Sequence, residues 1–225
     1  MSATPALRAV IFDFDGVLAD TEGLHYAAFQ SVAAGAGLTL THADYLEQFL
    51  GLPDRDCLAA LYAQAARPVT DAELDRLVED KRAAFAALSR RARLYPGVVE
   101  TLHRLHTRLA LAIASGAFRD EIEPILEREG VRSLFAAVVG AGDVRAGKPA
   151  PDPFLEALRQ LRQRAAPLLA AAECVVIEDS PRGLAAARAA GMRCVAVTTH
   201  HERAALAGAE AFIEDVRSLH VEDLP

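Results

Sequence analysis

Short apolar runs of strand length alternate with segments of helical periodicity through most of the chain. The apolar runs are 9–14, 109–115, 136–140, 173–179 and 194–199, with 211–213 as a sixth at the edge. The helical segments between them are 96–105, 119–129, 151–163 and 183–190. Strands that alternate with helices in this way predict an α/β fold, in which a parallel sheet is wound with helices on both faces.

A purely helical block interrupts this alternation directly after the first strand. Its helical patterns cover 21–36, 41–50, 53–65 and 70–88. Nothing in the block resembles a strand, so we expect a small antiparallel bundle at residues 19–89. The sheet domain would then consist of residues 1–18 and 90–225. A bundle inserted beside the ligand crevice of a parallel sheet is typical of a lid, or cap.

Composition and charge exclude several classes of function. The chain of 225 residues has a net charge of −7 and no basic block, so nucleic acid is not an expected partner. It has no uncharged apolar run long enough to span a membrane, and Met1–Pro5 does not begin a signal peptide. Three cysteines without metal-ligand spacing are expected to be buried, reduced thiols. These features favour a cytoplasmic protein that does not bind membranes, as a monomer or a weak dimer.

Polar residues gather where the predicted strands end. Asp13 and Asp15 follow the first strand, Ser115 follows the second, and Glu178 with Asp179 ends the fourth. The carboxyl ends of parallel strands meet at one edge of the sheet, where ligands bind, so these side chains should converge. An ordinary Asp-Gly turn after the first strand and a helix cap at the serine are the alternatives.

Lysine is rare in this chain. Of the 24 basic residues, only Lys81 and Lys148 are lysines, and the others are arginines. A compact ammonium is not interchangeable with a guanidinium at a tight site. The Gly-Lys-Pro sequence around Lys148, after the third strand, favours a place over the crevice. For Lys81, chance retention explains the lysine equally well.

The predicted site is too acidic to stand alone. Two carboxylates about 4 Å apart repel by roughly 4 kcal/mol at an effective dielectric of 20. One ammonium cannot compensate three or four of them, so we expect a divalent cation, and all-oxygen ligands favour Mg²⁺. Mg²⁺ with a carboxylate nucleophile, a hydroxyl and a lysine suits phosphoryl transfer.

These motifs resemble the four motifs of the haloacid dehalogenase superfamily, in the same order and spacing. They are Asp13-Phe-Asp15-Gly-Val, Ser115-Gly116, Lys148-Pro149 and Glu178-Asp179-Ser-Pro-Arg-Gly183. The segments at 20–25 and 148–154 resemble the branch that contains β-phosphoglucomutase and small sugar-phosphate phosphatases. The resemblance implies a Rossmann-like core with a helical cap inserted after the first motif.

The resemblance also implies roles for single residues. Asp13 would be the nucleophile that forms an aspartyl-phosphate, and Asp15 would act as the general acid and base. Lys148 and the Ser115-Gly116 pair would hold the transferring phosphoryl group. Mg²⁺ would be bound by Asp13, Asp15 and Asp179, with Glu178 as a further ligand or as a carboxylate behind the ligands.

In the helical block, Thr21, His25 and Lys81 fall where this branch places residues that reach the substrate. An ordinary helix position explains His25 equally well. The mutase branch also has an arginine near this chain's Gly51 turn, which grips a second phosphate. Here the aligned residue is Asp54, and the adjacent Arg55 could restore the contact only by a shift of about 100° around the helix.

We therefore expect a Mg²⁺-dependent phosphatase of a small phosphate ester, a sugar or polyol phosphate. A phosphosugar mutase is the alternative, against which Asp54 counts. A dehalogenase needs neither Asp15 nor the acidic pair at 178–179. A non-enzymatic signalling module with a phosphorylated aspartate needs no cap of this length. The substrate itself is not identified by the sequence.

Overall fold

The computed structural model describes residues 6–224 and divides the chain into two compact units. The first consists of Met1–Asp20 with Arg93–Pro225, and the second of Thr21–Ala92. The expectation about a signal peptide at Met1–Pro5 lies outside the described residues. Over residues 6–224, no helix is both long and apolar enough to cross a membrane.

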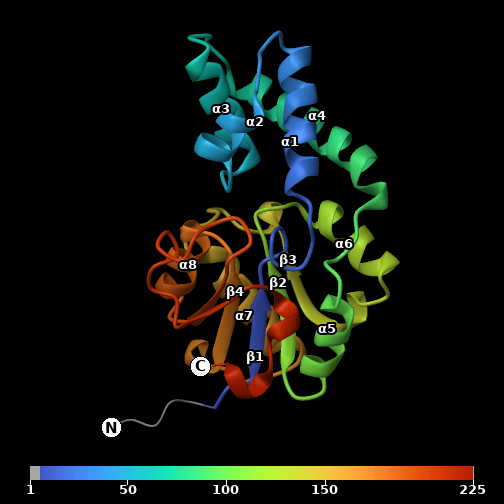
Figure 1. Ribbon diagram of the computed structural model, residues 1–225, viewed down its shortest axis with the longest axis vertical. Helices are drawn as coiled ribbons and strands as arrows, with labels where there is room; N and C mark the ends of the chain where they lie inside the picture. The colour runs from blue at the N-terminus through green and yellow to red at the C-terminus, as the bar shows by residue number, and fades with distance from the viewer. Residues whose placement is uncertain (1–5, 225) are drawn as a thin grey trace. The chain divides into compact units, whose positions relative to one another are not determined.

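The first unit is built on one six-stranded sheet in the order β3-β2-β1-β4-β5-β6, with every pair parallel (Figure 1). The strands are β1 (Ala9–Phe12), β2 (Ala110–Ala114), β3 (Phe135–Val139), β4 (Cys174–Glu178), β5 (Arg193–Val197) and β6 (Ala211–Ile213). All six predicted strands are present. The sheet confirms the predicted α/β, Rossmann-like class.

The order of the strands determines which helices cover which face. The helices are α5 (Val98–His106), α6 (Arg119–Arg128), α7 (Asp152–Arg164) and α8 (Pro181–Ala189). From β1 to β3 the chain moves along the sheet in one direction, and from β3 to β5 it moves in the other. Because such crossovers are right-handed, α5 and α6 lie on one face and α7 and α8 on the other. Neighbouring β1 and β4 therefore lead to opposite faces, which makes their carboxyl ends the switch point of the sheet.

The sheet is buried on both faces, as its apolar strands require. Ile11 and Val176 pack in one cluster with Phe154 of α7 and Leu184 of α8. Side chains alternate along a strand, so Phe12 points to the opposite face, where its ring meets Phe135 edge-on. Burial on both faces holds the strands rigidly and fixes where each strand ends relative to its neighbours.

The second unit is helical, with α1 (Glu22–Gly35), α2 (His42–Asp44), α3 (Asp54–Gln64) and α4 (Asp71–Leu88). Its apolar core includes Phe29 of α1, Leu58 of α3 and Leu77 of α4. Thr70 and Glu73 form the predicted capping box at the start of α4.

One helix of this unit differs from its prediction. The segment 41–50, predicted as a single short helix, is one α-helical turn followed by a π-helical turn at Tyr45–Phe49. The amide of Leu50 donates to the carbonyl of Tyr45 at 2.9 Å, a bond that spans five residues and widens the turn. The wider turn comes just before Gly51, whose φ of +75° reverses the chain.

Candidate active site

The register of the sheet brings the polar strand ends together. Phe12 pairs with Ile113 on one side and with Ile177 on the other. The Asp13 amide continues this pattern and donates to the carbonyl of Ile177 at 2.9 Å. The three strands therefore end at the same height, and the residues that follow them leave the sheet at one edge.

Lys148 lies between two carboxylates at this edge. Its Nζ is 2.9 Å from Asp13 Oδ1 and 2.5 Å from Glu178 Oε1. The ammonium also lies 5.1 Å from the centre of the Phe154 ring. Arg182 of α8 holds the lysine's backbone, since its Nη2 donates to the Lys148 carbonyl at 2.6 Å. The loop after β3 is thus fixed both at its main chain and at its side chain.

Glu178 is completely buried and folds over the first turn of α8. Its Oε2 accepts hydrogen bonds from the Ser180 amide at 2.8 Å and the Ser180 hydroxyl at 2.9 Å. A Cβ on Gly183 would lie 1.8 Å from the Glu178 carboxyl carbon. Glycine at this position is therefore required for the carboxylate to approach the positive end of the helix.

Asp179 has a partner that the sequence analysis missed. His200, in the loop after β5, has its Nδ1 2.8 Å from Asp179 Oδ2. The signal was available, because His200 follows a predicted strand just as the other site residues do. Burial raises the pKa of Asp179 to about 6, and the charge of Glu178 adds to this, although the bond from His200 opposes it.

Burial and neighbouring charge compete at the other two groups. Burial raises the pKa of Asp13 well above its usual range, and the charges of Glu178 and Asp179 add to the effect, while Lys148 opposes it. Burial alone would lower the pKa of Lys148, but the Asp13 and Glu178 carboxylates outweigh it and raise that pKa. Lys148 is therefore a fixed positive charge and not a base at neutral pH.

The carboxylates form a group that suits a metal ion. One oxygen from each of Asp13, Glu178 and Asp179 lies within 4.8 Å of the others. Three carboxylates face the single ammonium of Lys148, and neighbouring negative charge adds to the burial that raises the pKa values of Asp13 and Asp179. An all-oxygen donor set with excess negative charge fits a hard divalent cation such as Mg²⁺.

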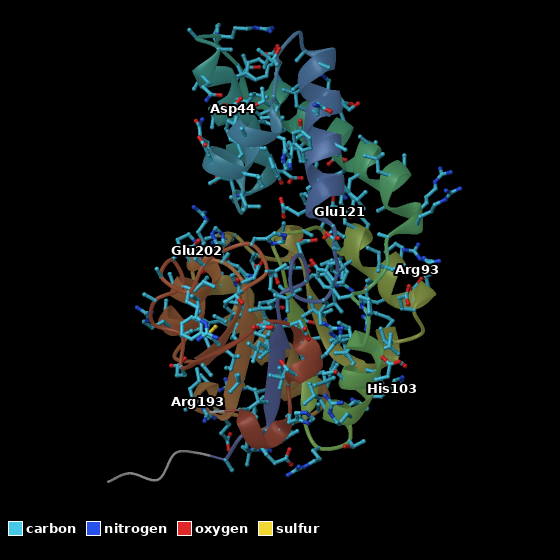
Figure 2. The ribbon with its side chains drawn as sticks, in the orientation of Figure 1. Asp44, Arg93, His103, Glu121, Arg193 and Glu202 are labelled. Atoms are coloured by element: carbon cyan, nitrogen blue, oxygen red, sulfur yellow. The ribbon has the colours of Figure 1, made fainter. Side chains whose placement is uncertain are left out.

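Asp15 and Ser115 meet beside this group. The Ser115 hydroxyl donates to Asp15 Oδ2 at 3.4 Å and accepts from the Ala117 amide at 3.1 Å. Gly116, between Ser115 and Ala117 in this loop, is exposed. At the start of α6, Glu121 accepts from the Phe118 amide at 2.9 Å and closes this loop (Figure 2). All the site residues expected in the sheet domain therefore lie in neighbouring loops of the first unit.

The second unit contains a buried charged cluster of its own. Lys81 on α4 is fully buried, with Nζ 2.9 Å from Asp54 Oδ2 and 2.8 Å from His25 Nδ1. The ammonium lies over the rings of Phe29 and Phe85, and His25 stacks on Phe85 at 4.2 Å. Asp54, which stands where the mutase branch has an arginine, is thus paired with a cation of α4.

The other residues of the second unit that were named from the sequence are also buried or paired. Arg55 bonds Asp71 at 2.6 Å and also pairs with Asp75. Thr21, at the start of α1, is completely buried. Arg55 on α3 therefore has two carboxylate partners, Asp71 and Asp75. Lys81 on α4 has a carboxylate partner in Asp54, the first residue of α3.

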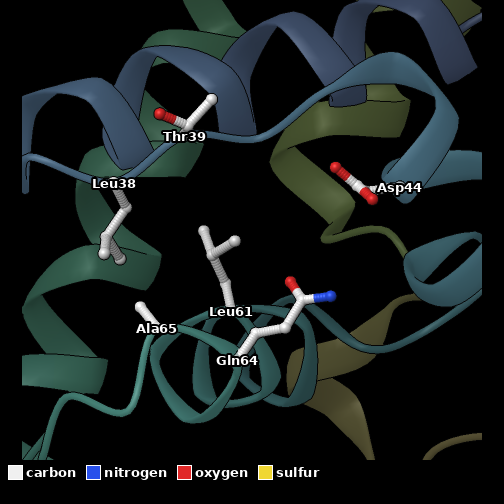
Figure 3. Close-up of a pocket in the computed structure, with 6 residues that line it drawn as sticks. All are labelled: Leu38, Thr39, Asp44, Leu61, Gln64 and Ala65. Carbon is white, nitrogen blue, oxygen red and sulfur yellow. The ribbon is translucent and has the colours of Figure 1, made fainter.

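A shallow pocket of about 330 Å³ lies elsewhere in the second unit (Figure 3). It is lined by Leu38, Thr39, Asp44, Leu61, Gln64 and Ala65. Its only charged lining residue is the Asp44 carboxylate, which would repel a phosphate. The pocket is not a candidate for the site of phosphoryl chemistry.

Comparison with known proteins agrees with this geometry. The model of the haloacid dehalogenase-like hydrolase family matches residues 10–197. The phosphorylated carbohydrates phosphatase of Thermotoga maritima is 32% identical over 221 residues, 96% of this chain and 98% of that protein. Protein CbbY of Rhodobacter capsulatus is 32% identical over 205 residues, 88% of each chain.

The same relationship is found among solved structures. The crystal structure of CbbY from Rhodobacter sphaeroides in complex with phosphate superposes with a TM-score of 0.83 at 26% identity. The match covers 95% of this chain and 96% of that one. The chain belongs to the haloacid dehalogenase-like hydrolases.

The buried ion pair of the second unit allows a stability test. Asp54→Asn removes a carboxylate partner of the buried Lys81 ammonium, and loss of one partner of a buried pair costs about 3–5 kcal/mol. We expect the free energy of unfolding of the second unit, measured with urea, to fall by about 3 kcal/mol. Asp71→Asn, which removes an exposed partner of Arg55, is the matched control and should cost about 1 kcal/mol or less. Equal losses in the two variants would show that the Asp54–Lys81 pair is not an important contact.

Proposed function

We propose that the protein is a Mg²⁺-dependent phosphatase that hydrolyses phosphorylated sugars or polyols through an aspartyl-phosphate. The observation that carries this proposal is the Lys148 ammonium held between Asp13 and Glu178 at the switch point of the sheet. Transfer of a phosphoryl group needs both a nucleophile and a fixed positive charge beside the phosphorus atom. The relation to a phosphatase of phosphorylated carbohydrates supports the substrate class.

In the first half of the reaction, Asp13 is the nucleophile. A carboxylate oxygen of Asp13 forms a bond to phosphorus while the bond from phosphorus to the substrate's alcohol oxygen breaks. The carboxyl group of Asp15 donates its proton to that leaving oxygen. Lys148, Ser115 and the Gly116 backbone hold the oxygens of the phosphoryl group during the transfer.

In the second half, Asp15 acts as the base. Its carboxylate takes a proton from a water molecule, the water oxygen bonds to phosphorus, and the bond to Asp13 breaks. Inorganic phosphate leaves, Asp13 is again a carboxylate, and Asp15 is again protonated. The contact between Ser115 and Asp15 in the free protein supports this role, because it places the Asp15 carboxyl group beside the hydroxyl that is assigned to the phosphoryl oxygens.

Mg²⁺ would be held by Asp13, by Asp179 and by the backbone carbonyl of Asp15. When bound, the ion supplies positive charge that stabilises the negative charge on the phosphoryl oxygens. Glu178 is assigned a place behind these ligands, because its two oxygens already accept bonds from Lys148 and Ser180. It would anchor the lysine and complete the charge balance of the site.

In this proposal, the helical unit determines which substrate is accepted. Residues 19–89 act as a cap, and Thr21, His25 and Lys81 are the cap residues that we expect to contact the substrate. The cysteines Cys57, Cys174 and Cys194 are buried free thiols, which supports a reducing compartment such as the cytoplasm. A monomer or a weak dimer remains our expectation.

Two substitutions test the division of labour between the aspartates. Asp13→Asn should reduce turnover to background, because the amide is a poor nucleophile of the same shape. Asp15→Asn should slow turnover by about 10²–10⁴-fold. With p-nitrophenyl phosphate, whose leaving group needs little acid, Asp15→Asn should still release a burst of p-nitrophenolate. The phosphoenzyme should then accumulate and be visible by intact mass spectrometry.

The control for these variants is Glu127→Gln, which changes an exposed carboxylate of α6 to an amide and should leave turnover unchanged. A phosphorylated peptide other than the one containing Asp13 would contradict the assignment of the nucleophile. So would an Asp13→Asn enzyme with turnover near that of the wild type, since water would then attack the substrate directly.

The choice between phosphatase and mutase has a separate test. Arg55, the cation that could replace the missing arginine, is already paired with Asp71 and Asp75, which leaves it poorly suited to hold a second phosphate. With β-glucose 1-phosphate and glucose 1,6-bisphosphate as primer, we expect release of inorganic phosphate to exceed formation of glucose 6-phosphate. A panel of sugar and polyol monophosphates, assayed for phosphate release, would then rank the substrates. Faster interconversion than hydrolysis would make the protein a mutase.

A further inference from the structure

The loop after β5 contacts both of the loops that carry the proposed metal ligands. The Thr199 hydroxyl donates to the carbonyl of Gly16 at 2.7 Å, in the loop after β1. The next residue, His200, bonds the carboxylate of Asp179, in the loop after β4. Two consecutive residues therefore connect the segment that follows Asp15 with the end of the β4 strand.

The three loops are in tight contact at this point. A Cβ on Gly16 would lie 2.1 Å from Asp179 Oδ2 and 2.7 Å from His200 Nδ1. Gly16 also has a φ of +74°, which other residues rarely adopt. The backbone of Gly16 thus packs directly on the hydrogen-bonded pair, and the pair has little room to move. The His200 side chain is 21% exposed and that of Asp179 only 8%.

This contact determines how Asp179 presents its carboxylate. His200 Nδ1 lies 2.8 Å from Asp179 Oδ2, and since an ionised carboxylate can only accept, the tautomer with a proton on Nδ1 donates to this oxygen and holds the rotamer of Asp179. One oxygen of this carboxylate also lies within 4.8 Å of an oxygen of Asp13 and of Glu178, so the orientation of Asp179 bears directly on the acidic cluster. Carboxylates that bind metals are commonly oriented by such a hydrogen bond, and its loss typically weakens metal binding by about 10–100-fold.

We propose that His200 is a positioning residue, which holds Asp179 in the orientation that binds the divalent cation. This inference rests on the proposed Mg²⁺-dependent function and names a residue that supports it. The required chemistry is one N–H donor at the place of Nδ1, carried by a side chain short enough to fit beside Gly16. His200 contacts neither substrate nor cation in this role.

The test is Mg²⁺ binding by isothermal titration calorimetry, at one pH and in the absence of substrate. His200→Ala should raise the dissociation constant of Mg²⁺ by about 10–100-fold. His200→Asn should restore binding close to that of the wild type, because the amide nitrogen of asparagine takes the place of Nδ1. Glu202→Gln is the control on the same loop (Figure 2), since Glu202 is exposed, and it should bind Mg²⁺ like the wild type.

The outcomes separate this inference from the proposed function. If the wild type and His200→Ala bind Mg²⁺ equally well and melt at the same temperature, His200 does not position the site and the inference is wrong. If the alanine and asparagine variants lose affinity equally, the Nδ1 hydrogen bond is not the cause and the inference is also wrong. If the wild type itself binds no Mg²⁺, the proposed metal dependence fails, and the role of His200 fails with it.

Discussion

The site depends on one buried interaction, the Lys148 ammonium between the carboxylates of Asp13 and Glu178. Without this cation, three buried carboxylates would face each other with no ammonium between Asp13 and Glu178. With it, Asp13, the proposed nucleophile, is held at one oxygen, and a fixed positive charge stands at the proposed position of the phosphoryl group. Much of the surrounding structure keeps these three side chains together. Arg182 holds the lysine's backbone, and Ser180 holds the glutamate.

The fold explains why such an arrangement is possible. Six parallel strands buried on both faces form a rigid frame, and the reversal of chain direction opens the sheet at the ends of β1 and β4. The carboxylates reach this place only because the backbone of two neighbouring turns comes closer to them than a residue with a Cβ atom would allow. Gly16 and Gly183 remove two Cβ atoms that would overlap Asp179 and Glu178. These glycines are therefore part of the site, although they carry no chemistry of their own.

The sequence predicted the sheet and most of the site, because hydrophobic periodicity and strand ends are local signals. Strand ends predicted that Asp13 and Glu178 lie close together, and the rarity of lysine with the Gly-Lys-Pro context placed Lys148 with them. The same reasoning from strand ends, applied to the fifth strand, would have found His200. The pairing of Lys81 with Asp54 was beyond reach, since it depends on how α4 packs against α3. The π-helical turn was also missed, because its apolar pattern is close to that of an α-helix.

The role of the Lys148 ammonium is tested most directly with the variant Lys148→Met. Its dissociation constants for Mg²⁺ and for inorganic phosphate are measured together with its turnover and compared with those of the wild type. If Lys148 supplies the fixed charge, its loss leaves the acidic cluster more negative, so Mg²⁺ should bind at least as tightly as in the wild type. Competitive inhibition by phosphate should disappear, and turnover should fall by about 10²–10³-fold. A Lys148→Met protein that binds phosphate and turns over like the wild type would contradict the central role of this ammonium.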